Sequence, residues 1–429
     1  MKRRVYKIFW ALFLLVVLAF LTSNLLYLPT QQNIKIGDPL IPRSAFHSGF
    51  AHHLSWHLSG GQKMIAFSRG VPVAMTPGQL RMQFKLFGLI PFREMLVNVI
   101  TPPQVMVCGH SIGVFLHAEG ILVIGHTVVE DSSGKKHNPA ERAGILSGDL
   151  IMKANNTPVQ NDQRLRDEIE RSGQKGKPIV LEIKRNKKTF LVKINPVFCK
   201  ETGRYRIGLF IRDSTAGMGT LTFYDPKTNL YGALGHIVTD VDSPGKIDLS
   251  DGKIVNALVQ EVYAGYKGRP GEKIGIFQGK ARFAGDIQKN TPFGIFGTLQ
   301  QSPGNYFYPN PMPVALAYEI ATGPAEILTV LKGERIERFS VEIEKVNPQI
   351  RPEGKGLVIR VTDQNLIRRA GGIIQGMSGS PIIQNGKFVG VVTHVFVNDP
   401  TRGYGVPAEW MLQEAGFFAE KERGSEFAA

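Results

Sequence analysis

The second half of the chain consists of short apolar segments separated by turn signals, and this texture constrains the fold more than any other feature. After Asn195-Pro196 the pattern predicts strands at 220–224 and 230–234 around a polar turn, and no long helix before 407–415. Such spacing is typical of a β-barrel or a double barrel. The 47 glycines and 26 prolines agree with a β-rich chain, and 429 residues require two or three domains.

One loop in this half has the composition of a nucleophile loop. Gly376-Met377-Ser378-Gly379-Ser380-Pro381 leads into an apolar pair and then Asn385-Gly386, a strong hairpin signal. The N–H groups of Gly376 and Ser378 can point at one position beside the Ser378 hydroxyl, as in the oxyanion hole of acyl-transfer enzymes. Ser380 precedes a proline and is therefore expected in the extended strand. Ser378 is the predicted nucleophile.

A serine nucleophile needs a base and a group that orients the base. His236 follows a strand of small residues and is the preferred base, whereas His394 lies on the strand after the hairpin. The order of histidine and then serine is that of chymotrypsin-like double β-barrels. Spacing alone leaves Asp363 and Asp286 open as the acid. A triad of this kind requires no metal and no organic cofactor, and we expect none.

Residues 105–197 resemble a bacterial-type PDZ domain. Two strands are expected around Ala118-Glu119-Gly120, then a short helix at 139–143, a longer helix ending near Gly173, and a hairpin through Arg185-Asn186-Lys187. PDZ domains bind a peptide as an added strand, and backbone N–H groups hold its carboxylate. The resemblance places that edge at Ser111, Ile112, Gly113 and Val114. A PDZ domain that only packs and binds no peptide is the alternative.

The N-terminus predicts a membrane anchor. Four basic residues precede an apolar run at 8–21 that resumes at 25–28, which is typical of an uncleaved span with the protein body outside the cytoplasm. The formal net charge is +15, but the basic residues are scattered and no nucleic-acid motif occurs, so an anionic lipid surface is the favoured partner. Cys108 and Cys199 form a disulfide or remain thiols, and the sequence leaves both open.

The whole chain is similar to the stage IV sporulation protein B peptidase family. The resemblance rests on "GTLTFYDPKTNLYGALGHIVTD", "GGIIQGMSGSPIIQNGKFVGVVTHV" and "DPTRGYGVPAEWML". It implies a catalytic triad of His236, Asp363 and Ser378, and it favours Asp363 over Asp286. The implied domains are an anchor at 1–28, a small β or linker region at 29–104, a PDZ domain at 105–197, and a chymotrypsin-like double β-barrel peptidase at 198–429.

The resemblance also implies a role in endospore formation. Such a peptidase is secreted across the forespore membrane and acts in the space between forespore and mother cell. It cleaves itself and the regulatory subunit of an intramembrane metalloprotease, which releases pro-sigma-K processing, and its PDZ domain serves recognition of itself and of its substrate. The alternative is an anchored PDZ receptor or scaffold without catalysis, in which the two motifs around His236 and Ser378 are ordinary turns.

Overall fold

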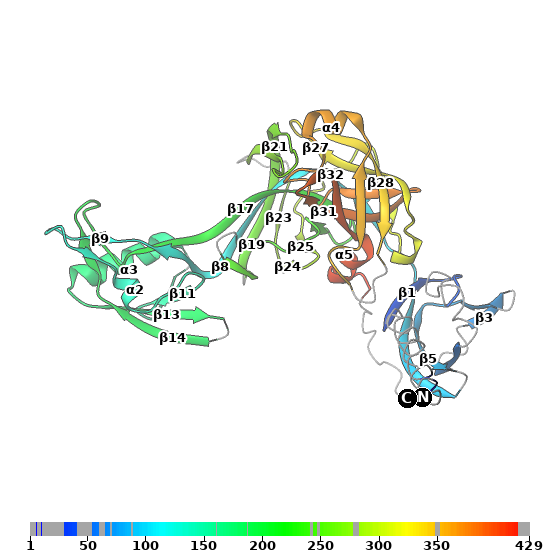
Figure 1. The fold of residues 1–429 in the computed structure, drawn as a ribbon, viewed down its shortest axis with the longest axis horizontal. Coiled ribbons are helices and arrows are strands. Elements are labelled where there is room, and N and C mark those ends of the chain that lie inside the picture. Colours follow the sequence, from blue (N-terminus) through cyan, green and yellow to red (C-terminus); the bar gives the residue numbers. More distant parts are fainter. Residues whose placement is uncertain are drawn as a thin grey trace.

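The protein is mainly β and is divided into regions that Figure 1 shows side by side. A computed structural model describes Tyr6, Trp10 and residues 30–40, 54–59, 65–68, 71–86, 89–159, 161–186, 188–240, 243–246, 249–277, 283–347 and 352–418. No helix within these ranges has the length and apolarity needed to cross a membrane. The predicted anchor at 1–28 lies outside the described residues, apart from Tyr6 and Trp10.

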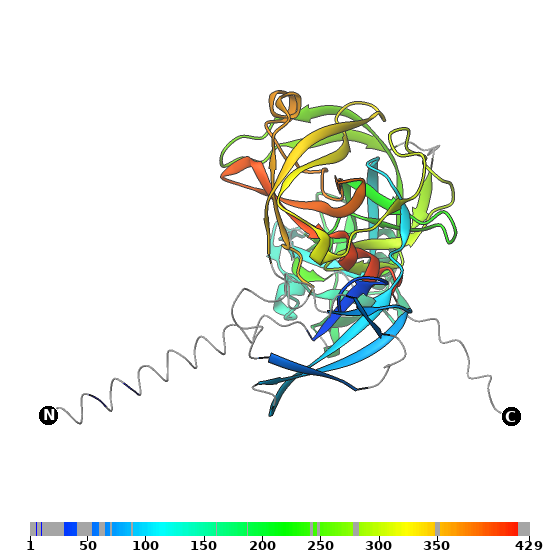
Figure 2. The same ribbon diagram turned by 90° about the vertical axis from the view of Figure 1, so that its right-hand side faces the viewer.

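The described residues of the N-terminal region form a small β-sheet. Its sheet has the order β1-β6-β5-β2, and its core includes Leu80, Met82 and Val97. In Figure 2 this sheet lies below the peptidase region. The strands are β1 (Gln31–Lys35), β2 (Leu54–Ser59), β5 (Gly78–Leu86) and β6 (Ile90–Ile100), with a separate pair β3 (Ile65–Ser68) and β4 (Val71–Ala74).

A buried carboxylate joins this domain to the peptidase region. Glu409 is 3% exposed and accepts hydrogen bonds from Asn33 Nδ2 at 2.7 Å and from the Ala317 N–H at 2.6 Å. Burial raises the pKa of Glu409 to about 7. Beside it, Glu319 pairs with both Lys35 and Lys387. The contact is therefore polar and specific, in contrast to the apolar cores on either side.

The PDZ region packs one longer helix against a small sheet. In α3 the Asn161 side chain caps the N-terminus by accepting from the Arg164 N–H at 2.9 Å, and Leu165 and Ile169 face the core at a four-residue spacing. The elements are β9 (Val129–Glu130), β10 (Lys136–His137), α2 (Pro139–Arg142), β11 (Leu150–Ala154), β12 (Thr157–Pro158), α3 (Asp162–Gln174), β13 (Ile179–Arg185), β14 (Lys188–Ile194), β15 (Val197–Cys199) and β16 (Arg204–Arg206).

Two strands run through both the PDZ and the peptidase regions. β8 (Ser111–His126) and β17 (Leu209–Tyr224) pair antiparallel along this length and form the ribbon that bridges the two regions in Figure 1. The expected turn at Ala118-Glu119-Gly120 is therefore wrong. A Cβ on Gly120 would lie 2.6 Å from the Ile151 carbonyl oxygen, so this glycine allows close approach of β11 and does not make a turn.

The peptidase region begins with strands that extend from this ribbon. Cys108 is a buried free thiol here, and Cys199 is a buried free thiol in the PDZ region, so the two do not form a disulfide. The strands are β7 (Gln104–Val107), β18 (Leu230–Ala233), β19 (Thr239–Asp240), β20 (Ser243–Lys246), β21 (Leu249–Tyr263), β22 (Glu272–Phe277), β23 (Ala284–Asp286), β24 (Lys289–Thr291), β25 (Gly294–Thr298) and β26 (Met312–Pro313).

The peptidase region ends in a closed barrel of order β27-β28-β29-β32-β31-β30. Asn385 and Gly386 both have positive φ, at 51° and 71°, which confirms the hairpin that the sequence predicts between β30 and β31. The elements are η4 (Ala317–Glu319), β27 (Gly323–Val330), β28 (Ile336–Val346), β29 (Leu357–Val361), α4 (Gln364–Ala370), β30 (Pro381–Gln384), β31 (Lys387–Phe396), β32 (Asp399–Pro407) and α5 (Ala408–Glu414).

Candidate active site

The loop between α4 and β30 is shaped by glycines with positive φ. Gly376 has φ 89° and Gly379 has φ 95°, a region that L side chains rarely adopt. A Cβ on Gly379 would lie 2.1 Å from the Thr220 carbonyl oxygen and 2.6 Å from the Leu234 N. The loop can therefore approach β17 and the end of β18 this closely only because a glycine stands at position 379.

Two buried threonines of β17 hold this loop in place. Thr220 Oγ1 donates to the Gly376 carbonyl oxygen at 2.8 Å, and Thr222 Oγ1 donates to the Gly379 carbonyl oxygen at 2.8 Å. The Thr220 N–H also donates to the Ser378 carbonyl oxygen at 2.9 Å. Both threonines have no exposed surface, so these hydrogen bonds are shielded from water. The carbonyl groups of the loop are thus turned inward, toward β17.

The two amides predicted for the oxyanion hole are unused by the protein. In the loop, the N–H groups of Met377, Gly379 and Ser380 donate to backbone carbonyl oxygens, at 2.8 to 3.1 Å. No acceptor in the described part of the chain takes the N–H of Gly376 or of Ser378. Because backbone N–H groups rarely remain unpaired, two of them in one glycine-rich loop indicate an anion-binding position.

His236 follows β18 through two residues with positive φ, Leu234 at 71° and Gly235 at 74°. Its Nδ1 lies 2.8 Å from the Ile237 carbonyl oxygen. A carbonyl oxygen can only accept, so Nδ1 carries the proton and Nε2 of the neutral ring is the basic nitrogen. Burial lowers the pKa of His236 below its ordinary value, which keeps the ring neutral near pH 7.

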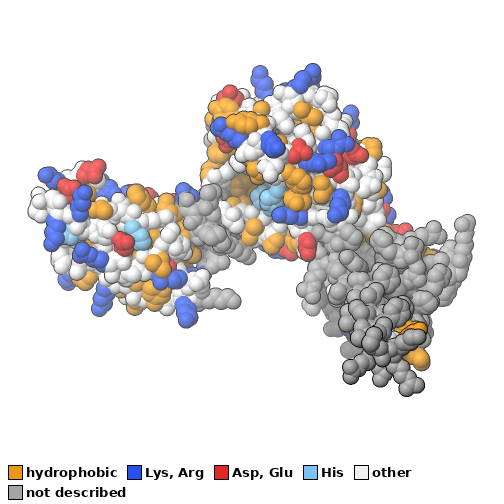
Figure 3. Space-filling view, viewed as in Figure 1, with side chains coloured by type: hydrophobic (Ala, Val, Ile, Leu, Met, Phe, Trp, Pro, Cys, Tyr) orange, Lys and Arg blue, Asp and Glu red, His pale blue; other side chains and the backbone are white. Residues whose placement is uncertain are grey.

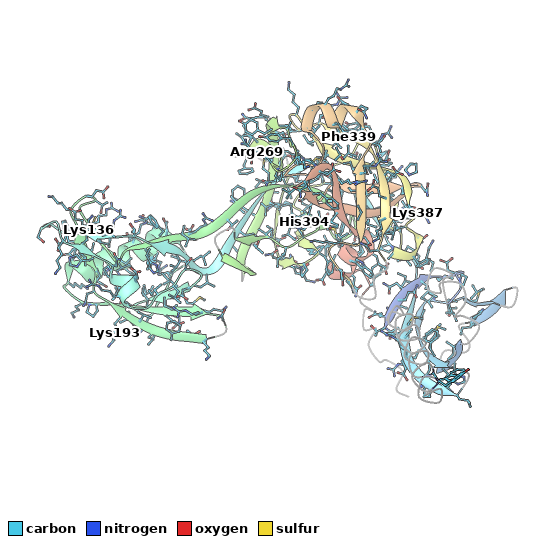
Figure 4. All side chains as sticks on the ribbon, viewed as in Figure 1. Lys136, Lys193, Arg269, Phe339, Lys387 and His394 are labelled. Atoms are coloured by element: carbon cyan, nitrogen blue, oxygen red, sulfur yellow. The ribbon has the colours of Figure 1, made fainter. Side chains whose placement is uncertain are left out.

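His394 lies against His236, with the ring centroids 4.9 Å apart and the planes tilted by 42°. Its pKa is lowered to about 4, first by burial of the ring and then by the charges of His236 and Lys355. His394 is therefore neutral whenever His236 accepts a proton, and the pair avoids a repulsion between two cations. Figure 4 shows His394 within the peptidase region, and Figure 3 shows a histidine among apolar side chains on that face.

The loops of Ser378 and His236 meet at Thr393. Ser378 Oγ donates to the Thr393 carbonyl oxygen at 2.7 Å. On the other side, a Cβ on Gly235 would lie 3.0 Å from Thr393 Cγ2, so the backbone just before His236 packs on the same residue. No hydrogen bond joins Ser378 to His236 in the described part of the chain. Proton transfer between them requires the serine hydroxyl to leave Thr393.

Two parts of the chain match known protein families. Residues 203–412 match the SpoIVB peptidase S55 family, and residues 118–195 match the PDZ domain family. The chain belongs to the SpoIVB S55 family. It is a serine peptidase with a PDZ domain.

Solved structures of low identity resemble parts of this S55 peptidase. The active form of the Rv3671c protease from M. tuberculosis is 15% identical, covers 47% of this chain and 74% of its own, and has a TM-score of 0.27. The protease Anisep from Arthrobacter nicotinovorans is 12% identical, with coverages of 47% and 88% and a TM-score of 0.28. The PDZ domain of an SdrC-like protein from Listeria monocytogenes is 22% identical, with coverages of 22% and 87% and a TM-score of 0.18. The assignment as a serine peptidase rests on the family match.

Asp363 of the S55 peptidase does not lie beside His236 but caps α4. Its Oδ1 accepts from the N–H groups of Asn365 at 2.9 Å and Leu366 at 3.1 Å. His394 pairs with Tyr404 on β32, and Tyr404 pairs with Val358 on β29, so Val358 lies at the level of His394. Asp363 lies five residues after Val358, roughly 16 Å further along the extended chain. The structure thus places Asp363 at the far end of β29 from the histidines.

The alternative acid is also engaged elsewhere. Asp286 accepts from the N–H and the hydroxyl of Thr298 and from Gln288. Neither of the two carboxylates that the sequence left open therefore orients His236 in this arrangement. The Ile237 carbonyl oxygen takes that place, because it holds Nδ1 and fixes the tautomer. Within the described ranges, no group of three histidine, cysteine or acidic side chains could hold a metal ion.

A pair of substitutions at Asp363 separates capping from a triad role. Asparagine caps helices about as well as aspartate, so Asp363→Asn is expected to retain activity within about threefold, while Asp363→Ala loses about 1 kcal/mol of stability. A triad acid would instead make Asp363→Asn lower kcat by about 10⁴-fold. The measurement is kcat for both variants, with their melting temperatures. A large loss of kcat in a stable Asp363→Asn would contradict the capping role.

The predicted PDZ edge at Ser111–Val114 is wrong. These residues lie in the peptidase part of β8, where β17 pairs with them on one side and β21 pairs with Ile112, Gly113 and Val114 on the other. All four are buried. A strand that already has both neighbours cannot accept a peptide as a further strand. The glycine at 113 serves the close packing of Phe277, since a Cβ there would lie 2.3 Å from that ring.

A free edge of the PDZ region lies instead at the start of β17. Leu209–Ile211 pair with β8 on one side, and no strand in the described ranges pairs with the other side. That side faces α3, whose Asp162 N–H donates to Asp213 Oδ2 at 3.2 Å. Gly208 is buried with φ 79°, and Phe210 is 55% exposed. The signal that sequence reasoning missed is Arg206-Ile207-Gly208-Leu209-Phe210, beyond the boundary assumed at 197.

Proposed function

We propose that this S55 peptidase is a membrane-anchored serine endopeptidase that acts outside the cytoplasm in sporulation signalling. Its substrates would be its own N-terminal region and the regulatory subunit of an intramembrane metalloprotease, whose cleavage releases pro-sigma-K processing. The family match supports the peptidase activity, and the basic residues before the apolar run at 8–28 support the anchor. The space between forespore and mother cell is the proposed location.

The observation that carries the chemistry is the meeting of the Ser378 and His236 loops at Thr393, beside two unused amides. In the proposed reaction His236 Nε2 takes the hydroxyl proton of Ser378, and the oxygen attacks the peptide carbonyl. The Gly376 and Ser378 amides then bind the oxyanion. His236 returns the proton to the leaving amine, and a water molecule releases the acyl group by the same route.

The PDZ region would present protein substrates to this site. The edge at Leu209–Ile211 has no strand partner on its α3 side within the described ranges, which is the arrangement that adds a peptide as an extra strand. The same strand, β17, carries Thr220, which holds the Gly376 carbonyl group. The strand proposed to bind the substrate, β17, therefore also holds the nucleophile loop. The chain itself is one proposed ligand of this edge.

Self-processing tests this function directly. The purified full-length protein is expected to shorten at its N-terminal region, as read by intact mass and N-terminal sequencing. Ser378→Ala is expected to remain full length, and Ser380→Ala is expected to shorten as the wild type does. Addition of wild type to Ser378→Ala should shorten the variant if one copy cleaves another.

A variant of the PDZ edge shows whether that edge contributes. Phe210→Asp changes an exposed side chain of the cleaving copy. This enzyme variant is expected to cleave the Ser378→Ala protein more slowly than the wild type does, while its hydrolysis of a short peptide is unchanged. Shortening that persists in Ser378→Ala alone would mean that another protease is responsible. Equal rates of cleavage between copies for wild type and Phe210→Asp would contradict the proposed role of the PDZ edge.

A further inference from the structure

Lys273 is a buried amine that the reaction described above does not use. It lies on β22 and is only 4% exposed. Its Nζ donates to Thr329 Oγ1 at 2.8 Å and to Ser111 Oγ at 3.4 Å. Burying a cation without a counter-ion is costly, and an apolar side chain of the same length would be cheaper at such a position. A lysine here therefore points to a role beyond packing.

The stem of Lys273 lies against the nucleophile loop. The Lys273 N–H donates to the Gln375 carbonyl oxygen at 3.1 Å, and the Gln375 N–H donates to the Gly271 carbonyl oxygen at 2.8 Å. A Cβ on Gly376 would lie 3.2 to 3.3 Å from Cβ, Cγ and Cδ of Lys273. The aliphatic part of the lysine is thus in contact with the backbone of the residue whose N–H is proposed to bind the oxyanion.

The opposite side of Gly376 is held by β17. Thr220 Oγ1 donates to the Gly376 carbonyl oxygen at 2.8 Å, and Thr220 is the strand partner of Ser111, which accepts from Lys273. Lys273, Ser111 and Thr220 therefore form one buried polar cluster behind the loop. The Gly376 peptide is fixed between the lysine stem and the threonine hydroxyl.

The groups that face the Lys273 ammonium are neutral. β8 contributes the Ser111 hydroxyl, β27 contributes the Thr329 hydroxyl, and β21 pairs with Lys273 through Val262. No carboxylate of the described chain lies within 4.0 Å of Nζ. Burial alone lowers the pKa of Lys273 to about 7. The positive charge is therefore not cancelled by a nearby anion.

We propose that Lys273 is a positioning residue for the oxyanion site. Its stem fixes the Gly376 peptide, and its ammonium favours the negative charge that develops on the oxygen bound by the Gly376 and Ser378 amides. A preorganised positive charge in a water-excluded site acts more strongly than it would in solvent. This inference rests on the proposed function, because it takes Ser378 as the nucleophile and Gly376 as an oxyanion donor.

The test compares the wild type with Lys273→Met, which keeps an unbranched stem and removes the charge. The readout is the rate at which a fluorophosphonate probe labels Ser378, measured from pH 6 to pH 9. The ammonium is present below pH 7 and is lost as the pH rises through about 7. We expect Lys273→Met to react about 10-fold more slowly at pH 6 and the two rates to converge by pH 9.

The dependence on pH separates this role from a structural one. A stem that only supports the loop would give a ratio of rates that is the same at every pH, and that result would overturn the electrostatic part. Equal rates at every pH, in a Lys273→Met that melts as the wild type does, would overturn the proposal altogether. Lys332→Met removes an exposed lysine and is expected to show no effect. Labelling that persists in Ser378→Ala would refute the proposed function itself.

Discussion

Ser378→Ala is expected to abolish peptide-bond hydrolysis by the S55 peptidase, with kcat lowered on the order of 10⁶-fold. The alanine has no atom that can attack a carbonyl carbon, and only binding and the oxyanion donors remain. His236→Ala is expected to cause a loss of similar size, because the serine then has no base. Removal of both groups should cost about as much as removal of either. The measurement is kcat on one peptide substrate for the two single variants and the double variant.

Ser380→Ala is the matched control for this result. Ser380 is fully buried, and its Oγ has no hydrogen-bond partner among the described residues. Its N–H donates to the Met377 carbonyl oxygen at 2.9 Å. Loss of an unpaired buried hydroxyl leaves the backbone of the loop unchanged and is expected to alter kcat by less than about threefold. If Ser380→Ala abolished hydrolysis while Ser378→Ala retained it, the assignment of the nucleophile would be wrong.

Gly379→Ala is expected to have the second largest effect. The backbone at this position has φ 95°, and the new methyl group would meet the Thr220 carbonyl oxygen at 2.1 Å. This oxygen belongs to the backbone of a buried strand and cannot rotate away. Positive φ in an L residue costs about 1–2 kcal/mol, and overpacking adds about 1–3 kcal/mol. We expect a lower melting temperature and a loss of kcat of at least about 100-fold, because the loop must move off Thr220.

Gly386→Ala separates the two causes. Gly386 also has positive φ, at 71°, but no atom of the described part of the chain lies within 4 Å of the position of its missing Cβ. This variant should lose only the conformational part, about 1 kcal/mol, and retain nearly full kcat. Thermal unfolding and kcat are measured for both variants. Similar behaviour of the two would show that contact with Thr220 does not hold the nucleophile loop.

Local signals in the sequence predicted the elements that a few residues determine. The Asn385-Gly386 hairpin formed because both residues adopt positive φ readily. α3 formed where Asn161 caps it and apolar residues recur at helical spacing. The loop around Ser378 was recognised because glycines at fixed positions let the backbone turn inward. In each case neighbours in the sequence are sufficient to specify the structure.

Features that depend on distant partners were not predictable in this way. The PDZ resemblance placed the peptide edge on β8, where Gly113 was expected to allow close approach of a backbone. Instead β17 and β21, about 100 and 140 residues later, occupy both sides of it. The free edge of the PDZ region comes from a segment beyond the expected domain boundary. Lys273 carries no motif at all, since only the fold brings it under Gly376.

The position of Asp363 shows a conflict between two local interpretations. The family resemblance suggested a triad acid, whereas spacing alone did not distinguish Asp363 from Asp286. The same residue begins Asp363-Gln364-Asn365-Leu366, a helix start that is followed by Gly371 in the left-handed conformation at the helix end. The helix α4 was not expected from the sequence, and its N-cap explains why the carboxylate points to backbone N–H groups. The local sequence at Asp363 indicates a helix N-cap.

The roles of Ser378 and His236 are tested most directly by covalent labelling with a fluorophosphonate probe. The labelled residue and the dependence of the labelling rate on His236 are measured. The probe is applied to wild type, His236→Ala and Ser380→Ala, and the modified peptide is identified by mass spectrometry. We expect one modified residue, Ser378, in wild type and in Ser380→Ala, and a labelling rate that falls by several orders of magnitude in His236→Ala. Labelling at another residue, or a rate at Ser378 that is independent of His236, would contradict these roles.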